Sequence, residues 1–162
     1  MSDPADIRAW QRLDARVTTS GRLQAGDPAR LAAIGVRHIV NLALVEHPEA
    51  LAGEAALCAA AGIRYTHIPV PFDAPDESHF AAFRAAIEAD DMPVHVHCIA
   101  NFRVSAFFYR YHRAVTGMDE PAARALMARH WTPEMHTHPM APVWATFIAP
   151  AGSVQTSSGE TE

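Results

Sequence analysis

Residues 94–105 read Val94-His95-Val96-His97-Cys98-Ile99-Ala100-Asn101-Phe102-Arg103-Val104-Ser105. The first four residues have the character of a short buried strand, and after a brief loop an arginine and a serine open a long helical pattern. We therefore expect Cys98 at a strand end, facing the N-terminus of a helix. Backbone N–H groups and the helix dipole favour negative charge there, so the position suits a thiolate and also a phosphate dianion.

The segments around this stretch alternate between strands and helices. The patterns predict strands at 16–19, 22–25, 36–44, 63–70 and 92–97, and helices at 27–35, 48–62, 77–89, 102–115, 120–130 and 139–149. This alternation predicts an α/β fold whose central, mostly parallel sheet of four to five strands is covered by helices on both faces. Ligands of such sheets bind at the carboxyl ends of the strands, where Cys98 is expected.

Length and charge limit the classes of function. The 162 residues predict one domain at 16–150, after a variable, partly helical lead-in at 1–15 and before a disordered tail at 151–162. The net charge of −5 argues against a nucleic-acid partner, and no apolar run is long enough to span a membrane. Two cysteines without a secretory signal favour the cytoplasm.

Three further segments accompany the HCIANFRVS motif. They are SGRLQAGDPARLAAIGVRHIVNL at 20–42, GIRYTHIPVPF at 62–72, and a distal pair formed by WTP at 131–133 and WATFI at 144–148. In this order the segments resemble the cysteine-dependent protein tyrosine phosphatases, specifically their compact dual-specificity-like bacterial branch. The resemblance covers about residues 16–149. It implies a tyrosine phosphatase-like fold and a phosphatase for a phosphorylated protein or small molecule, with no metal and no organic cofactor.

The resemblance also implies roles for individual residues. Cys98 would attack phosphorus and form a phosphocysteine intermediate, while His97 would fix the loop by hydrogen bonding. Ser105 would donate a hydrogen bond to the thiolate and help it leave. The residues implied to bind phosphate or another oxyanion are Ile99, Ala100, Asn101, Phe102 and Arg103.

The spacing between Cys98 and Arg103 differs from the usual pattern of that superfamily. Four residues separate them instead of five, so Val104 stands at the usual position of the arginine. Either the loop is one residue shorter and active, which we favour, or Arg103 points elsewhere and the site is impaired. The loop also lacks glycine, and Asn101 is the residue that best tolerates the left-handed conformation that glycine would adopt.

The general acid is expected in the loop at 70–76. Asp76 is placed to cap the helix at 77–89, so we assign the acid to Asp73, which has no structural role of its own in the pattern. Phe72 falls nearly at the acid position of the superfamily. An enzyme without the acid would act only on substrates with good leaving groups.

Several other residues have simpler interpretations. The histidine pairs at 95/97 and 136/138 lack the acidic or histidine partners of a metal site, so we expect no bound metal. Arg110 and Arg113 are expected on a solvated helix face. Cys58 shares a helical face with residues 51, 54 and 55, which favours a buried, inert thiol over a disulfide with Cys98.

Two other functions remain open. The short loop and the uncertain acid would also fit a phosphate-binding pseudophosphatase that acts as an interaction module. The paired histidines would fit a metallohydrolase, which metal analysis of the purified protein would reveal.

Overall fold

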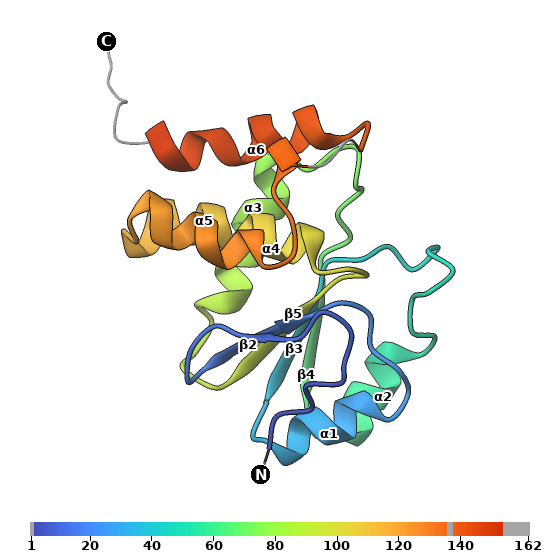
Figure 1. Ribbon diagram of the computed structural model, residues 1–162. Helices are drawn as coiled ribbons and strands as arrows, with labels where there is room; N and C mark the ends of the chain where they lie inside the picture. Colours follow the sequence, from blue (N-terminus) through green and yellow to red (C-terminus); the bar gives the residue numbers. More distant parts are fainter. Residues whose placement is uncertain (1, 136–137, 154–162) are drawn as a thin grey trace.

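The computed structural model describes residues 2–135 and 138–153. Its five-stranded sheet has the order β1-β2-β5-β3-β4 (Figure 1). The first pair is antiparallel and the other three pairs are parallel. The strands are β1 Gln11–Arg12, β2 Val17–Ser20, β3 His38–Asn41, β4 Arg64–His67 and β5 Val94–His97. The strand that leads to Cys98 is therefore the central one.

Helices cover both faces of the sheet (Figure 1). One face carries α1 Asp27–Ala33 and α2 Glu54–Ala60. The other carries α3 Glu77–Ile87, α4 Phe102–Tyr111, α5 Glu120–Ala128 and α6 Ala141–Ser153. A π-helical turn at His112–Thr116 follows α4, and a 3₁₀ turn at Pro133–Met135 precedes α6. The architecture is the predicted mostly parallel α/β sheet.

The alternation of side chains along β5 separates the two layers. Val94 and Val96 belong to the larger core, which is shared with α3, α4, α5 and α6. His95 and His97 point to the other face, as residues of opposite parity in a strand must. That face holds a smaller core, which includes Leu31 of α1 and Cys58 of α2. Cys98, just beyond the strand, packs in the larger core.

Some predicted elements differ from the structure. Residues 22–25 form no strand, and residues 2–15 contain the short strand β1 and turns instead of a helix. The helix predicted from residue 48 begins only at Glu54, after Gly53 in the left-handed conformation with φ of 70°. Helix α6 continues to Ser153, and the rest of the predicted tail lies outside the described residues.

No helix among the described residues is long and apolar enough to cross a membrane.

Candidate active site

The central strand, the cysteine and the following helix are arranged as the sequence predicts. Cys98 directly follows β5, and its exposed fraction of 1% places it at the base of the loop at 99–101. Asn101 adopts the left-handed conformation with φ of 68°, and α4 begins at the next residue. Asn101 therefore makes the tight turn that glycine usually makes.

The carbonyl groups of the loop are held by the surrounding chain. His97 Nδ1 donates to the carbonyl oxygen of Cys98 at 3.2 Å. The backbone N–H of Arg22, in the connection after β2, donates to the carbonyl oxygen of Ile99 at 2.9 Å. These two hydrogen bonds fix the peptide planes on either side of the start of the loop.

The N–H groups of the same loop are left without protein acceptors. The backbone N–H groups of residues 99–101 donate to no residue in the described part of the chain. Adjacent N–H groups that precede a helix N-terminus form an anion-binding nest, and buried N–H groups without an acceptor are otherwise rare. The loop can therefore accept an oxyanion beside Cys98.

Gly21 allows the connection after β2 to approach the loop. A Cβ atom at this position would lie 2.4 Å from the carbonyl oxygen of Ile99, closer than any real Cβ contact. The missing side chain lets the neighbouring residue, Arg22, donate its N–H to that oxygen. Gly21 is thus required by close packing against the loop.

Arg103 lies in the first turn of α4 and is buried, with an exposed fraction of 7%. Its Nη1 donates to the carbonyl oxygen of Val70 at 2.9 Å, and its guanidinium lies 5.7 Å from the centre of the Phe72 ring. Within the described residues no carboxylate forms an ion pair with it. A buried guanidinium without a carboxylate partner is costly unless an anion compensates its charge.

The loop at 70–76 is held against Arg103 and α6. Trp144 Nε1 donates to the carbonyl oxygen of Phe72 at 2.7 Å, and the Phe72 ring packs against that tryptophan. Asp73, the next residue, is exposed and forms no hydrogen bond or ion pair with a described residue. Asp76 caps α3 by accepting from the backbone N–H of His79. Of the two aspartates in this loop, Asp76 is therefore engaged as a cap, and Asp73 has a side chain that is free to act.

Asn101 and Ser105 lie together behind the loop. The Ser105 hydroxyl donates to Asn101 Oδ1 at 3.0 Å, so its contact in this structure is not the expected one with Cys98. The Asn101 amide donates to the carbonyl oxygen of Ala9 and to the hydroxyl of Thr19. These hydrogen bonds tie the left-handed residue to the lead-in and to β2.

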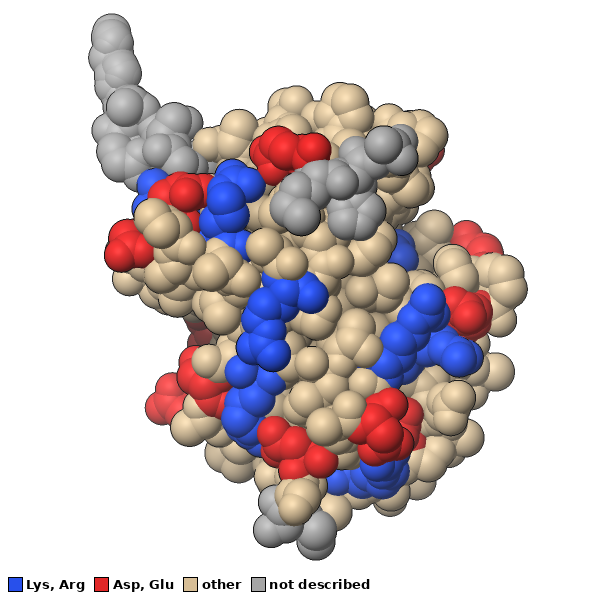
Figure 2. Space-filling model, viewed as in Figure 1, with Lys and Arg blue, Asp and Glu red and all other residues tan. Residues whose placement is uncertain are grey.

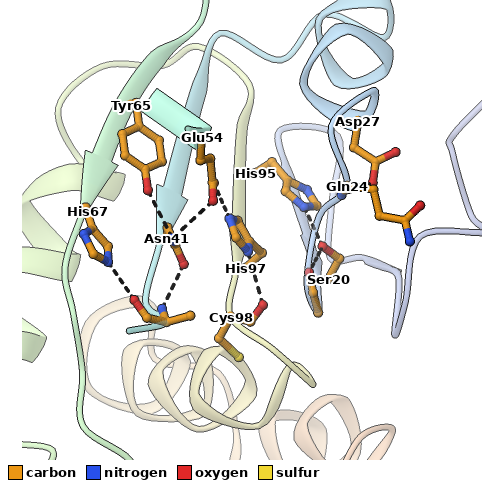
Figure 3. A network of polar contacts seen from close by, with 12 residues as sticks. Ser20, Gln24, Asp27, Asn41, Glu54, Tyr65, His67, His95, His97 and Cys98 are labelled. Atoms are coloured by element: carbon orange, nitrogen blue, oxygen red, sulfur yellow. Dashed lines mark hydrogen bonds and ion pairs between the residues drawn. The ribbon is translucent and has the colours of Figure 1, made fainter. Parts of the chain in front are cut away.

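A buried polar network extends from the loop to α2 (Figure 3). His97 Nε2 lies 2.5 Å from Glu54 Oε2, and both side chains are only 4% exposed. The second carboxylate oxygen of Glu54 accepts from Asn41 Nδ2 at 3.3 Å, and this amide also donates to the Tyr65 hydroxyl. The histidine that holds the carbonyl group of Cys98 is therefore held in turn by a buried carboxylate.

The comparison with known families gives a direct match. The family described as "Beta-lactamase hydrolase-like protein, phosphatase-like domain" matches residues 9–114, which include the strand, Cys98, Arg103 and α4. The chain belongs to this family. It is therefore a phosphatase-like protein, as the sequence resemblance implied.

Solved structures of the same fold lie among its neighbours. A DUF442 protein from Shewanella putrefaciens CN-32 is 29% identical, with a TM-score of 0.75 over 88% of this chain and 90% of that one. P. aeruginosa TpbA in complex with pTyr is 19% identical, with a TM-score of 0.69 over 98% and 95%. The core catalytic domain of the S. cerevisiae PP-IP phosphatase SIW14 is 11% identical, with a TM-score of 0.70 over 92% and 88%. No curated protein is similar enough in sequence to count as a match.

Two residues outside the site correct or refine the sequence interpretation of this phosphatase-like chain. Arg110 was expected on a solvated face, but it is only 8% exposed, because it lies over the rings of Phe80 and Phe147 and pairs with Glu77. Cys58 is a fully buried free thiol in the smaller core, on the opposite face of the sheet from the core that contains Cys98. Burial, with the charge of Glu54 as a second cause, raises the pKa of Cys58 to about 12.

The histidines proposed as a metal pair are used differently. His95 Nε2 donates to the Ser20 hydroxyl, and its Nδ1 accepts from the Thr18 hydroxyl, each at 2.8 Å. Burial first, and the charge of His97 second, lower the pKa of His95 well below its usual value, so the ring is neutral. Of the second pair, His136 lies outside the described residues. No cluster of three metal-ligating side chains occurs within the described ranges.

Sequence reasoning missed Glu54 as a part of the site. Its signal was a carboxylate on the same helical face as Leu51, Ala55 and Cys58, which are apolar. A charged residue on a buried helical face needs a partner, and the partner here is His97.

Proposed function

We propose that this chain hydrolyses phosphate monoesters through a phosphocysteine intermediate on Cys98. In the first step the thiolate attacks phosphorus, the S–P bond forms and the bond to the ester oxygen breaks. Arg103 and the N–H groups of residues 99–101 bind the non-bridging oxygens and stabilise the charge of the transferring group. Asp73 gives its proton to the leaving oxygen.

In the second step water attacks the same phosphorus. The S–P bond breaks, the thiolate is regenerated, and Asp73 accepts the proton that the water loses. Ser105 is in our proposal the residue that eases departure of the thiolate, acting through a hydroxyl that now contacts Asn101. His97 keeps the Cys98 carbonyl group in place during both steps.

One observation supports this function above all others. Cys98 directly precedes a loop whose backbone N–H groups have no acceptor among the described residues, and Arg103, in the first turn of the helix after that loop, is buried without a carboxylate partner. Figure 2 shows arginines and acidic residues interspersed on the visible face. Many of the arginines are paired with carboxylates, as in Arg12–Asp3 and Arg30–Asp6. We therefore infer that an anionic substrate is attracted by the local positive charge of the site and not by the net charge of the protein.

Hydrolysis of an aryl phosphate tests the proposal. We expect the wild type to release the phenol and Cys98→Ser to lose nearly all activity, because the hydroxyl is a much weaker nucleophile than the thiolate. Cys58→Ser is the matched control, and it should keep its activity because Cys58 lies on the other face of the sheet. Equal rates for the wild type and Cys98→Ser would refute the proposal.

Asp73 is tested separately. With an aryl phosphate that has a good leaving group, Asp73→Asn should hydrolyse the substrate nearly as fast as the wild type. With an alkyl phosphate, the rate of Asp73→Asn should fall by about 10²–10⁴-fold, because the leaving oxygen then needs the proton. Asp76→Asn is the control from the same loop, since Asp76 caps α3. The assignment of the acid would be wrong if both substrates lost activity equally.

The substrate class is a phosphorylated protein or a small phosphorylated molecule, and we propose dual specificity among phosphorylated side chains. TpbA, of the same fold, has been solved with pTyr. A compact chain offers few elements for building a deep slot that would select phosphotyrosine alone. Hydrolysis rates on a panel of phosphoserine, phosphothreonine and phosphotyrosine peptides measure this specificity.

For the compartment, we propose the cytoplasm. The two free cysteines fit a reducing environment of that kind.

A phosphate-binding module without turnover is the second candidate. It is favoured by two observations: Arg103 already donates to the carbonyl oxygen of Val70, and Asp73 forms no hydrogen bond or ion pair with a described residue. Vanadate or phosphate would then bind and stabilise the protein, and no phosphate ester would be hydrolysed.

A further inference from the structure

Glu54 and His97 form a pair of ionisable side chains inside the protein. The carboxylate comes from the first residue of α2 and the imidazole from the last residue of β5, 43 positions apart in sequence. Each side chain is 96% buried. The pair is linked to the nucleophile by the hydrogen bond from His97 to the carbonyl oxygen of Cys98. The proposed reaction uses His97 but leaves the carboxylate without a role.

The hydrogen bonds of the pair decide the state of the ring. His97 Nδ1 lies 3.2 Å from the carbonyl oxygen of Cys98, which can only accept, so Nδ1 carries a proton. Nε2 lies 2.5 Å from Glu54 Oε2, and the other oxygen of that carboxylate accepts from Asn41. With Asn41 Nδ2 donating to one carboxylate oxygen, the other oxygen is placed to accept from Nε2, which then also carries a proton. The ring is then an imidazolium.

We propose that Glu54 is a positioning residue that keeps His97 doubly protonated, so that a positive ring clamps the carbonyl group of Cys98 and stabilises the thiolate. The imidazolium is nearer to Cys98 than the carboxylate is, because the ring lies between them (Figure 3). The pair therefore acts on Cys98 as a positive charge that is only partly offset. The inference rests on the proposed function for its effect on turnover, but not for its effect on the thiol.

Other titratable groups near the pair are Tyr65, Cys58, His95 and His67. Burial raises the pKa of Tyr65, on β4, to about 12, and that of Cys58, on α2, to about 12. His95, stacked 6.3 Å from His97 on β5, is held neutral by burial. His67 donates to the carbonyl oxygen of Ala43 on the far side of Asn41. These four groups are the same in the wild type and in a Glu54 variant, so a difference between the pH profiles of Cys98 in the two proteins reports on the pair.

Glu54→Gln tests the proposal because it removes the charge and keeps the shape. Alkylation of Cys98 by iodoacetamide is followed across pH by peptide mass, which separates this cysteine from Cys58. We expect the midpoint of the alkylation profile to rise by about one pH unit in Glu54→Gln, since the ring loses its second proton and with it the partly offset positive charge that faces Cys98. Glu54→Asp should bring the midpoint part of the way back to the wild-type value. Glu120→Gln, which changes a partly exposed glutamate on α5, should match the wild type.

A role in folding alone gives a different pattern. If Glu54→Gln lowered the melting temperature but left the alkylation midpoint unchanged, the proposal would be overturned. The ring is also observed without any variant, by the nitrogen chemical shifts of the His97 imidazole in the labelled wild type. Two protonated ring nitrogens at pH 7 are expected, and one deprotonated nitrogen would overturn the proposal even if Glu54→Gln failed to fold.

These measurements are independent of turnover. If the wild type failed to hydrolyse any aryl phosphate, the proposed function would fail, while the alkylation profile and the ring nitrogens would still decide the role of Glu54. If the wild type is active, kcat in Glu54→Gln should fall more than KM changes, with its pH optimum displaced upward.

Discussion

Two buried arginines on α4 give a matched pair of perturbations. Arg103 and Arg110 are 7% and 8% exposed, two turns apart, but only Arg110 has a carboxylate partner, Glu77. Replacement of each by methionine keeps the length of the side chain and removes the charge. The stabilisation of the folded protein by bound phosphate or vanadate should disappear in Arg103→Met and persist in Arg110→Met.

The cost of Arg103→Met without an oxyanion is small. The variant loses one hydrogen bond, worth about 1 kcal/mol, and leaves the Val70 carbonyl oxygen unpaired at about 1–3 kcal/mol. It also loses the contact with the Phe72 ring, 5.7 Å from the guanidinium, worth about 0.5–1 kcal/mol. The variant also no longer buries a charge without a carboxylate partner, and this gain of several kcal/mol offsets those losses. Arg110→Met loses contacts with two aromatic rings at 4.4 and 4.9 Å from the guanidinium, about 0.5–2 kcal/mol each. Without an oxyanion, Arg103→Met should therefore have a higher free energy of unfolding than Arg110→Met.

The oxyanion separates the variants in the opposite sense. At a phosphate or vanadate concentration ten times its Kd, binding stabilises the folded state by RT ln 11, about 1.4 kcal/mol. For a chain of this size that raises Tm by roughly 3–6 °C. The wild type and Arg110→Met should show this rise, and Arg103→Met should lose most of it.

Thermal unfolding followed by circular dichroism measures the effect. Each oxyanion titration is matched by sodium chloride at equal ionic strength, which removes general screening. An equal rise of Tm in the wild type and Arg103→Met would show that the guanidinium does not face the oxyanion. The second alternative left open by the spacing, an arginine that points elsewhere, would then hold.

Three further predictions concern packing, backbone conformation and pH. Gly21→Ala brings a Cβ to 2.4 Å from the Ile99 carbonyl oxygen, so unfolding in urea should show a loss of about 1–3 kcal/mol together with reduced activity. Asn101→Gly keeps the left-handed backbone and should lose only the side-chain hydrogen bonds, whereas Asn101→Ala should lose a further 1–2 kcal/mol, roughly, from strain; equal losses would contradict this. The pKa of His95 is lowered in the folded protein, so below pH 6.5 this histidine is protonated in the unfolded chain but stays neutral in the folded one. Stability should thus fall as pH drops below 6.5, by up to about 1.4 kcal/mol per pH unit from this residue, and denaturant titrations between pH 7 and 5 that show no fall would exclude it.

The local features of the site could be predicted because each depends on neighbours in sequence. The short strand pattern at 94–97 predicted a buried strand before Cys98, and the helical pattern after Phe102 predicted α4. Asn101 was expected in the left-handed conformation because the tight turn had no glycine. The cap at Asp76 follows from its position directly before a helical pattern.

Features that depend on tertiary packing could not be predicted in this way. A helical pattern gives the apolar face of α2 but not the strand residue that it meets, so the contact of Glu54 with His97 was hidden. Arg110 looked solvated because the ring that covers it from α6, Phe147, lies 37 positions away. Residues 22–25 were predicted as a strand because they follow the turn pair Ser20-Gly21, but the N–H of Arg22 bonds to the loop and not to a neighbouring strand.

The contacts that shape the nucleophile loop have a consequence for how the protein acquires activity. The loop is fixed by Arg22, 77 positions away from Ile99, and by a histidine whose partner on α2 is 43 positions away. Contacts so distant in sequence form only when most of the chain has folded, because closing long loops costs entropy before any contact repays it. Oxyanion affinity should therefore appear late in refolding, together with the complete sheet, and a partly folded chain would carry a cysteine but no site.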